Sequence, residues 1–233
     1  MTEIPQRWIR SFVRREGRMT KAQQAALARL GDGCIITPSH GELDLDIAFG
    51  RHAPRTLEIG FGMGDALAAL ALAHRDTDYL GIEVHRPGVG SLLRAVEQQS
   101  LTNIRVVIAD AVDVLTHNIR DDSFDAVHLF FPDPWPKQRH HKRRIVQAAF
   151  VELLRRKLKA GGAFHMATDW EDYAKHMLAV MEAAPGYRNA AGAGKFSPRP
   201  QQRPLTKFEK RGQRLGHGVW DLLFIRGDDH SSR

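Results

Sequence analysis

Short apolar runs alternate with segments of helical spacing from about residue 55 onward. The runs are almost continuously apolar, which is typical of strands in a parallel sheet whose two faces are both covered. The predicted strands are residues 56–59, 79–84, 104–109, 126–131 and 163–167. The predicted helices are residues 65–74, a segment through Leu92, Leu93 and Val96, and residues 145–158 and 170–184. This alternation predicts a doubly wound α/β fold.

Two further features complete the predicted sheet. Gly161 and Gly162 follow the helix predicted at residues 145–158, and because glycine commonly ends a helix, we expect the helix to stop there. Residues 219–225 form one more apolar run, after a stretch rich in Gly, Pro and Arg. We expect this run to be a C-terminal antiparallel strand that pairs with a strand near Tyr187.

The chain divides by composition into three parts. Residues 1–30 are rich in basic side chains and form either a mobile arm or a helix that docks late in folding. Residues 31–226 hold the alternating pattern, and we expect a single domain there, since a chain of 233 residues can bury one large α/β core. Residues 227–233, GDDHSSR, are expected to form a disordered tail.

Positive charge is abundant and unevenly distributed. The chain has 34 Lys and Arg residues against 27 Asp and Glu residues, a formal net charge of +7, and its isoelectric point is about 9.8. Much of the positive charge falls in residues 7–21, 137–144 and 199–214. A basic protein of this size binds nucleic acid or an anionic membrane surface, or is simply basic. The clustering favours nucleic acid.

The compartment follows from what the sequence lacks. A single cysteine, Cys34, excludes an internal disulfide and indicates a reducing compartment. No apolar run approaches the roughly 18 residues that span a bilayer. The first residues, MTEIPQRWIRSF, lack the apolar core of a signal peptide. We therefore expect a cytoplasmic protein with no membrane partner.

Three alternate glycines follow the first predicted strand. Gly60, Gly62 and Gly64 stand at a strand-to-helix turn, where glycine lets a ligand approach the backbone closely. Such a turn can also need glycine for steric reasons alone. A dinucleotide-binding fingerprint has its third glycine one residue later, at the position that Asp65 occupies here. The spacing therefore disfavours NAD and suggests a different cofactor.

Acidic side chains accompany the first three strands. Glu58 lies inside the first strand, where a carboxylate is costly to bury without a partner, and S-adenosylmethionine offers an ammonium and a sulfonium. Glu83 closes the second strand, where a carboxylate can accept hydrogen bonds from ribose hydroxyls. Asp110 closes the third strand, where it either reaches an adenine amino group or caps the helix that follows.

The fourth strand runs into the segment FFPDPWPK, residues 130–137. Three prolines make this a stiff turn. It lies at the carboxyl end of a strand, which is where ligands bind in open α/β sheets. A rigid connection with Trp135 packed in the core is the alternative, but a connector has no reason to carry Asp133 and Lys137.

Five segments together resemble the bacterial tRNA (guanine-N7-)-methyltransferases. They are residues 57–67, 81–90, 130–144, 167–170 and 203–224. The resemblance implies a class I, Rossmann-like, S-adenosylmethionine-dependent methyltransferase fold, with the methyltransferase domain at residues 31–226. It also implies transfer of a methyl group from S-adenosylmethionine to N7 of guanosine 46 in the variable loop of tRNA.

The resemblance assigns roles by position. Asp133 looks like the catalytic residue and a cofactor contact, beside Glu58, Glu83 and Asp110 and the glycine loop. The implied substrate contacts are Lys137, Asp169, Thr206, Lys207, Phe208 and Glu209. The implied RNA-facing loop comprises Arg139, His140, His141, Lys142, Arg143 and Arg144. His140 and His141 lack metal-ligand spacing with other His or Cys residues, so no metal is expected. We expect a monomer or a homodimer.

Chemistry supports these roles. Guanine N7 carries a free lone pair at neutral pH, so its methylation needs in-line placement and tolerance of positive charge on the base, not a general base. Asp133 could accept hydrogen bonds from the amino and imino edge of guanine. Trp135 could stack on the base, and Lys137 could hold a phosphate.

Structural alternatives stay open for several residues. Asp169 could cap the helix at residue 170, and Thr206 with Glu209 matches a capping box. The run KQRHHKRR could be the solvated start of a helix. Three rival functions also remain: methylation of an exocyclic amino group, which uses a similar Asp-Pro-Pro-aromatic motif, a Rossmann dehydrogenase, and an RNA-binding protein without catalysis.

Overall fold

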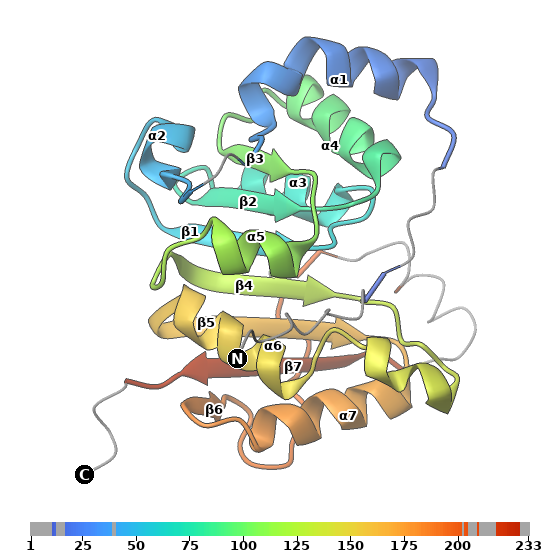
Figure 1. The fold of residues 1–233 in the computed structure, drawn as a ribbon, viewed down its shortest axis with the longest axis vertical. Coiled ribbons are helices and arrows are strands. Elements are labelled where there is room, and N and C mark those ends of the chain that lie inside the picture. The colour runs from blue at the N-terminus through green and yellow to red at the C-terminus, as the bar shows by residue number, and fades with distance from the viewer. Residues whose placement is uncertain are drawn as a thin grey trace, which may run out of the picture.

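The computed structural model describes residues 11–12, 17–38, 41–201, 203–204, 209 and 218–228. Its centre is a seven-stranded sheet with the strand order β3-β2-β1-β4-β5-β7-β6 (Figure 1). The strands are β1 Arg55–Ile59, β2 Asp78–Ile82, β3 Ile104–Val107, β4 Phe124–Phe130, β5 Leu158–Thr168, β6 Tyr187–Asn189 and β7 Trp220–Arg226. The first five strands pair in parallel. β7 pairs antiparallel with both β5 and β6. The predicted doubly wound sheet with a C-terminal antiparallel strand is confirmed.

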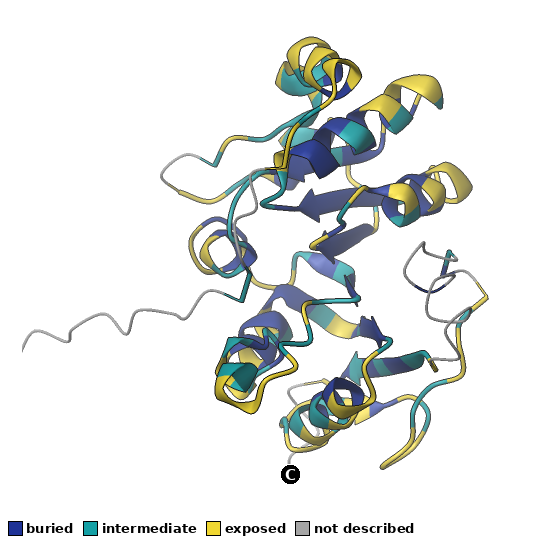
Figure 2. Cartoon of the chain, turned by 90° about the vertical axis from the view of Figure 1, so that its right-hand side faces the viewer, coloured by how far each residue is buried: buried dark blue, intermediate teal, exposed yellow. Residues whose placement is uncertain are grey.

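Helices cover both faces of this sheet. The helices are α1 Lys21–Cys34, α2 Leu45–Phe49, α3 Asp65–Ala73, α4 Arg86–Gln98, α5 Ala111–His117, α6 Ala148–Lys157 and α7 Glu171–Glu182, with a 3-10 helix at Gln138–Arg143. One apolar cluster joins α1, α3 and α4 to the sheet and includes Leu67 and Leu92. A second cluster joins α5, α6 and α7 to it and includes Phe150 and Met177. Burial of this kind explains why the strands are apolar on both faces (Figure 2).

For residues 1–30 the sequence left two alternatives open, a mobile arm or a docked helix, and helix α1 decides between them for the described part. Its start is fixed by a capping box, in which Gln23 N donates to Thr20 Oγ1 and Thr20 N donates to Gln23 Oε1. The Gln23 side chain then donates to the carbonyl oxygen of Pro87 at the start of α4. The described second half of the basic N-terminal stretch is therefore a docked helix. Residues 1–10 and 13–16 lie outside the described chain.

The predicted helix stop at Gly161–Gly162 is wrong. Helix α6 already ends at Lys157, and β5 begins with Leu158 and passes through both glycines. The pairing of β4 with β5 shifts register in this region. Gly161 has φ +75°, and a Cβ on Gly162 would lie 2.7 Å from the carbonyl oxygen of Lys159. The glycines therefore form an irregularity at the start of a strand, where a side chain would be strained at Gly161 and would clash at Gly162.

The topology brings the functional segments together. β1 lies between β2 and β4, so the chain order reverses at β1. In open α/β sheets a crevice forms at such a point, outside the carboxyl ends of the strands. The glycine loop, Glu83, Asp110 and Asp133 all follow carboxyl ends at this edge. Among the helices of the described residues, none is long and apolar enough to cross a membrane.

Candidate functional site

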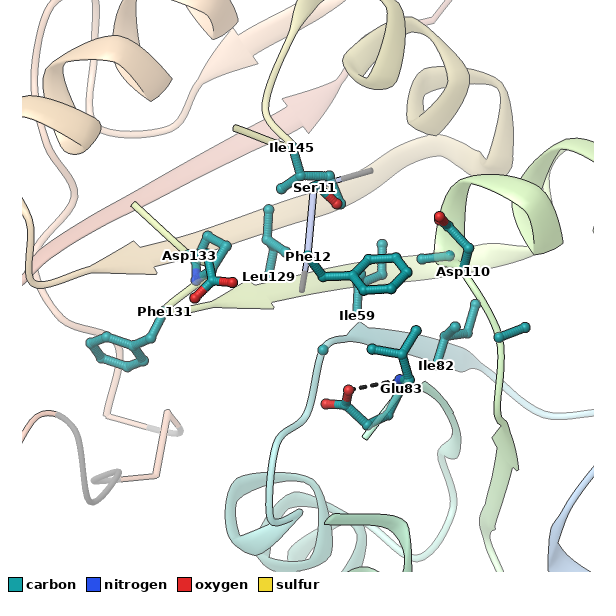
Figure 3. A pocket seen from close by; sticks show the side chains of 15 residues that line it. Ser11, Phe12, Ile59, Ile82, Glu83, Asp110, Leu129, Phe131, Asp133 and Ile145 are labelled. Carbon is teal, nitrogen blue, oxygen red and sulfur yellow. Dashed lines mark hydrogen bonds between the residues drawn. The ribbon is translucent and has the colours of Figure 1, made fainter. Parts of the chain in front are cut away.

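A pocket lies at the carboxyl ends of β1 to β4, where the topology predicts it (Figure 3). Its walls come from all four strand ends and from one segment near the N-terminus. The lining residues are Ser11, Phe12, Ile59, Gly60, Ile82, Glu83, Val84, Ala109, Asp110, Ala111, Leu129, Phe131, Pro132, Asp133 and Ile145. Among the described residues, this lining holds three carboxylates and no Lys, Arg or His. It therefore suits a ligand that carries cations and hydroxyl groups rather than phosphates.

The glycine loop has the geometry that the sequence predicted. Gly60, Gly62 and Gly64 have φ values of +70°, +57° and +81°. A Cβ on Gly64 would lie 2.7 Å from Cβ of Leu92 in α4, so the third glycine also allows close helix packing. Around Gly60 and Gly62 a Cβ would meet nothing within 4 Å. Gly64 is therefore required for packing against α4, whereas Gly60 and Gly62 leave open space beside the backbone.

Glu83 fixes the shape of this loop. Its Oε2 accepts a hydrogen bond of 2.8 Å from the backbone N–H of Gly62. Its Oε1 accepts from the N–H groups of Val84 and His85, at 2.7 Å and 2.9 Å. The carboxylate thus ties the glycine loop to the turn between β2 and α4. It also lines the pocket, and its Oε2, which accepts only one of these three bonds, has a second lone pair for a ligand hydroxyl.

Glu58 is a buried acid directly behind the pocket. It is 3% exposed and precedes Ile59 and Gly60, both of which line the cavity, although Glu58 itself does not. Among the described residues, its Oε2 has no hydrogen-bond partner. Burial, with a smaller contribution from the negative charge of Glu83, raises the pKa of Glu58 to about 8. A cation placed beside this carboxyl would favour its ionised form and oppose the effect of burial.

Asp110 caps helix α5 and lines the pocket, while its contact with an adenine amino group stays a prediction. Its Oδ1 accepts a 2.9 Å hydrogen bond from the N–H of Val112, so it caps α5. It also lines the pocket, on the side opposite Asp133 (Figure 3). A carboxylate held in this way is pre-oriented for a ligand, because the cap fixes its rotamer.

Asp133 lies on a strained turn at the end of β4. The backbone N–H of Phe131 donates to the carbonyl oxygen of Ala167, at 2.8 Å, which extends the ladder between β4 and β5 by one bond. Phe131 then has φ +52° and Trp135 has φ +46°. Each such conformation costs on the order of 1–3 kcal/mol and persists only where other contacts enforce it. Asp133 is exposed and faces the pocket between the two strained residues.

Asp169 occupies the equivalent place on the neighbouring strand. It comes two residues after Ala167, just as Asp133 comes two residues after Phe131, and these two anchor residues are hydrogen-bonded. The interpretation of Asp169 as a helix cap is wrong. The N-cap of α7 is Trp170, whose N–H donates to Thr168 Oγ1 at 3.2 Å. Asp169 is partly exposed at the same rim as Asp133.

Trp135 is held by three groups rather than buried in the core. Its indole Nε1 donates a 3.0 Å hydrogen bond to the carbonyl oxygen of Ser11. The guanidinium of Arg143 lies 4.8 Å from its ring centroid, and His140 approaches its edge. Ser11 and Phe12 were not identified from the sequence, because no local pattern marks a contact between residues 124 positions apart.

The basic run forms a short 3-10 helix, Gln138–Arg143, beside the pocket. Lys137, Arg139 and Lys142 are exposed, while His140, His141 and Arg143 are partly exposed. Slight desolvation, together with the positive charges around it, lowers the pKa of His140. The segment is therefore a separate, strongly positive 3-10 helix, which ends before α6 begins at Ala148.

Arg144 differs from the rest of this run. It is 3% exposed, and its Nε donates a 2.9 Å hydrogen bond to the carbonyl oxygen of Pro134. It also pairs with Asp172 and lies 4.9 Å from the ring centroid of Tyr173. In the structure Arg144 therefore supports the Asp133 loop from behind and is almost fully buried, whereas its contact with RNA stays a prediction.

The predicted substrate segment is only partly described. Thr206, Lys207 and Phe208 lie outside the described residues. Glu209 is 1% exposed, and its carboxylate pairs with Arg199 at 2.9 Å and with Arg203 at 2.7 Å. Among the described residues, no group of three His, Cys, Asp or Glu side chains is arranged to hold a metal ion.

Solved structures show the same fold at low identity. An antibiotic-related methyltransferase superposes with a TM-score of 0.54 at 18% identity, over 81% of this chain and 96% of that one. A 16S rRNA (adenine(1408)-N(1))-methyltransferase with cosubstrate SAM, from Catenulisporales acidiphilia, also gives 0.54, at 17% identity, over 82% and 95%. These likenesses establish the methyltransferase architecture.

Sequence relatives are much closer. Residues 52–222 match a family model described as "Putative methyltransferase". The tRNA (guanine-N(7)-)-methyltransferase of Pseudomonas entomophila is 59% identical over 224 residues, which cover 96% of this chain and 93% of that protein. The protein of the same name from Hydrogenovibrio crunogenus is 57% identical over 227 residues, covering 97% and 95%. The chain therefore belongs to the bacterial tRNA (guanine-N7-)-methyltransferase family.

Proposed function

We propose that this protein transfers a methyl group from S-adenosylmethionine to N7 of guanosine 46 in the variable loop of tRNA. The observation that carries the proposal is one pocket, at the carboxyl ends of β1 to β4, walled by Glu83, Asp110 and Asp133. Family membership supports the reaction, since the curated relatives are named for methylation of tRNA guanine at N7. The cofactor, the position in tRNA and the residue roles below are parts of this proposal.

The pocket fits S-adenosylmethionine on charge. The cofactor carries an ammonium, a sulfonium and two ribose hydroxyls, and it has no phosphate. Within the described part of the chain, the pocket lining is acidic and lacks basic side chains, and the buried Oε2 of Glu58 has no hydrogen-bond partner. A phosphate-bearing dinucleotide would meet like charge in the same place, which disfavours the dehydrogenase alternative.

Each acidic residue would hold a different part of the cofactor. Glu58 would face the ammonium group, Glu83 the ribose hydroxyls, and Asp110 the adenine amino group. Gly60, Gly62 and Gly64 leave the backbone open to close approach. When bound, S-adenosylmethionine supplies an electrophilic methyl group on sulfur. The protein's part is to hold that group in line with the acceptor and to exclude water.

Asp133 would bind the guanine base. Its carboxylate can accept hydrogen bonds from the N1 imino and N2 amino groups, which orients the base while leaving N7 free. Positive charge moves onto the base as the methyl group is transferred, and a fixed carboxylate stabilises that charge. Asp169, on the same rim, is proposed as a second contact of the substrate. No proton has to leave N7, so no general base is required.

The 3-10 helix and the residues before it would bind the tRNA backbone. Lys137, Arg139, Lys142 and Arg143 give a cationic surface directly beside the pocket. Phosphate contacts of this kind set the register of the RNA on the protein. His140 and His141 are proposed to take part in the same surface. Thr206, Lys207 and Phe208 are proposed as further substrate contacts by family resemblance alone.

The test is to map the methyl group. The purified protein is incubated with unmodified tRNA and radiolabelled S-adenosylmethionine, and the RNA is then reduced with borohydride and cleaved with aniline, which cuts at 7-methylguanosine. Cleavage at guanosine 46 is expected, and the Asp133→Ala variant is the matched control that should give none. Label that resists aniline cleavage would contradict N7 and favour methylation of an exocyclic amino group. Binding of tRNA and cofactor without any label would favour a non-catalytic RNA-binding protein.

A further inference from the structure

A fully buried arginine, Arg203, lies at the centre of a charged cluster beside the loop that carries Asp133. The side chain of Arg203 is 0% exposed. Its Nη1 and Nη2 donate to the two carboxylate oxygens of Glu209, at 2.7 Å and 3.1 Å. Its Nη2 also donates to Asp221 Oδ2 at 3.1 Å, and its Nε lies 2.8 Å from Asp221 Oδ1. One guanidinium therefore joins two buried carboxylates.

The cluster is tied to the sheet on its other side. Asp221 belongs to β7 and is 2% exposed, and its Oδ1 lies 2.8 Å from Nε2 of His165 in β5. Arg199 adds a second positive charge, with its Nε 2.9 Å from Glu209 Oε1. Among the described residues, two arginines thus face two carboxylates in this cluster. Such pairing is what allows ionised groups to remain buried.

Arg203 also contacts the two aromatic residues at the start of the loop that carries Asp133. Its Cζ lies 6.0 Å from the ring centroid of Phe130 and 5.7 Å from that of Phe131. Phe130 in turn packs edge-on against His165, with ring centroids 4.9 Å apart. Phe131 has φ +52°, which is unusual for an aromatic residue, and precedes Asp133 by two positions (Figure 3). A conformation of this kind requires surroundings that enforce it.

We propose that Arg203 is a positioning residue for methyl transfer, which acts through Phe130 and Phe131 to hold the Asp133 carboxylate in its reactive place. Glu209 is the buried counterion of Arg203 and does not touch RNA. Its two oxygens are already bonded to guanidinium groups, and it is 1% exposed. This inference rests on the proposed function of Asp133, and it departs from the substrate role that the family resemblance gives to Glu209.

The test compares two conservative variants at equivalent buried arginines. In Arg203→Lys an ammonium group replaces the planar guanidinium that bonds Glu209 and Asp221 and contacts two aromatic rings. The ammonium cannot make all of these contacts at once, so the cluster is held less rigidly. Arg226→Lys is the matched control. Arg226 is also a buried arginine and belongs to β7, the same strand as Asp221. It is 6% exposed and is paired with Asp122 and with the carbonyl oxygen of Leu158. It lies at the last position of β7, by the start of β5 and far from the loop.

The readouts are the single-turnover rate at saturating tRNA and cofactor, the Kd of each ligand, and the Tm. Arg203→Lys is expected to lower the single-turnover rate by about tenfold or more, with both Kd values within about twofold of wild type. Both variants are expected to lower the Tm by similar amounts. Arg226→Lys is expected to leave the single-turnover rate unchanged. Equal rates for the two variants at equal Tm would overturn the proposal, because stability alone would then explain the effect.

Glu209→Gln tests the counterion role separately. The amide keeps one acceptor for Arg203 and removes the negative charge. We expect a lower single-turnover rate and an unchanged Kd for tRNA. A weaker Kd for tRNA with an unchanged rate would mean that Glu209 contacts RNA and would overturn the assignment. Failure of the proposed function is distinguishable, since the wild-type protein itself would then give no 7-methylguanosine.

Discussion

The indole Nε1 of Trp135 donates a hydrogen bond to the carbonyl oxygen of Ser11, 3.0 Å away and 124 positions earlier in the chain. This bond joins the N-terminal segment to the loop that carries Asp133. The next residue, Phe12, lines the pocket, with its ring between Ile59 and Asp110 (Figure 3). Ser11 and Phe12 are therefore part of the wall of the proposed cofactor site.

We expect Phe12→Ala to weaken binding of S-adenosylmethionine by about 1 kcal/mol, roughly fivefold, because the ring supplies apolar contact to the ligand. Titration calorimetry with S-adenosylhomocysteine measures this directly. Trp135→Phe keeps the ring but removes the donor to Ser11, so it should weaken binding in the same direction and less strongly. Tighter binding by Phe12→Ala would show instead that the ring occupies the place of the cofactor.

Glu58 should make cofactor binding depend on pH. Without the cofactor, the pKa of Glu58 is about 8, because the carboxyl is buried and lies near Glu83. A cationic ligand favours the ionised form, so below pH 8 binding must release a proton. The affinity is then expected to fall toward tenfold per pH unit as the pH decreases from 8 to 6. Glu58→Gln should bind weakly at every pH, and an equally steep profile in that variant would assign the proton to another group.

The same residue should affect the stability of the protein without cofactor. The pKa of Glu58 is higher in the folded state, at about 8, than the ordinary value of 4.5. Between these values the folded state binds more protons than the unfolded state, so the stability contributed by the protonated carboxyl is lost as the pH rises from 4.5 to 8, by at most about 1.4 kcal/mol per pH unit. Glu58→Gln should therefore have a higher Tm than wild type at pH 8, and a smaller advantage at pH 5. Calorimetry that finds the same advantage at both pH values would contradict the raised pKa.

Arg143 and Arg144 are neighbours with different expected roles. Arg143 is partly exposed and lies over Trp135, whereas Arg144 is buried against Tyr173. Arg143→Ala is expected to weaken tRNA binding and to reduce the slope of log Kd against log salt by about one unit. Arg144→Ala should leave that slope unchanged and lower the stability by about 1–3 kcal/mol, because the Pro134 carbonyl loses its donor. A reduced slope in Arg144→Ala would place its guanidinium on the RNA.

Arg143 and Arg144 differ in a way that their sequence does not predict, whereas the convergence of the acidic residues is predictable. The carboxyl ends of parallel strands meet at one edge of the sheet, so the pattern predicts that Glu83, Asp110 and Asp133 converge. A run of basic residues does not reveal which side chain is solvated and which is buried. The burial of Arg144 depends on Asp172 and Tyr173, which lie far along the chain. Contacts such as Ser11 with Trp135, and bulges such as the one at Gly161, depend on tertiary packing and leave no local signal.

Asp133→Asn is the most direct test of the proposed chemistry. The substitution preserves size, and an amide oxygen can still accept one hydrogen bond, but the negative charge that would face the methylated base is lost. We expect the single-turnover rate to fall by at least about 100-fold, as when a preorganised group that stabilises transition-state charge is removed. Asp169→Asn is the matched comparison, since Asp169 occupies the equivalent place after β5. If Asp169 only binds the substrate, its variant should raise KM for tRNA with little change in the single-turnover rate. The opposite ranking of the two variants would transfer the catalytic role from Asp133 to Asp169, on the same rim and with the same pocket.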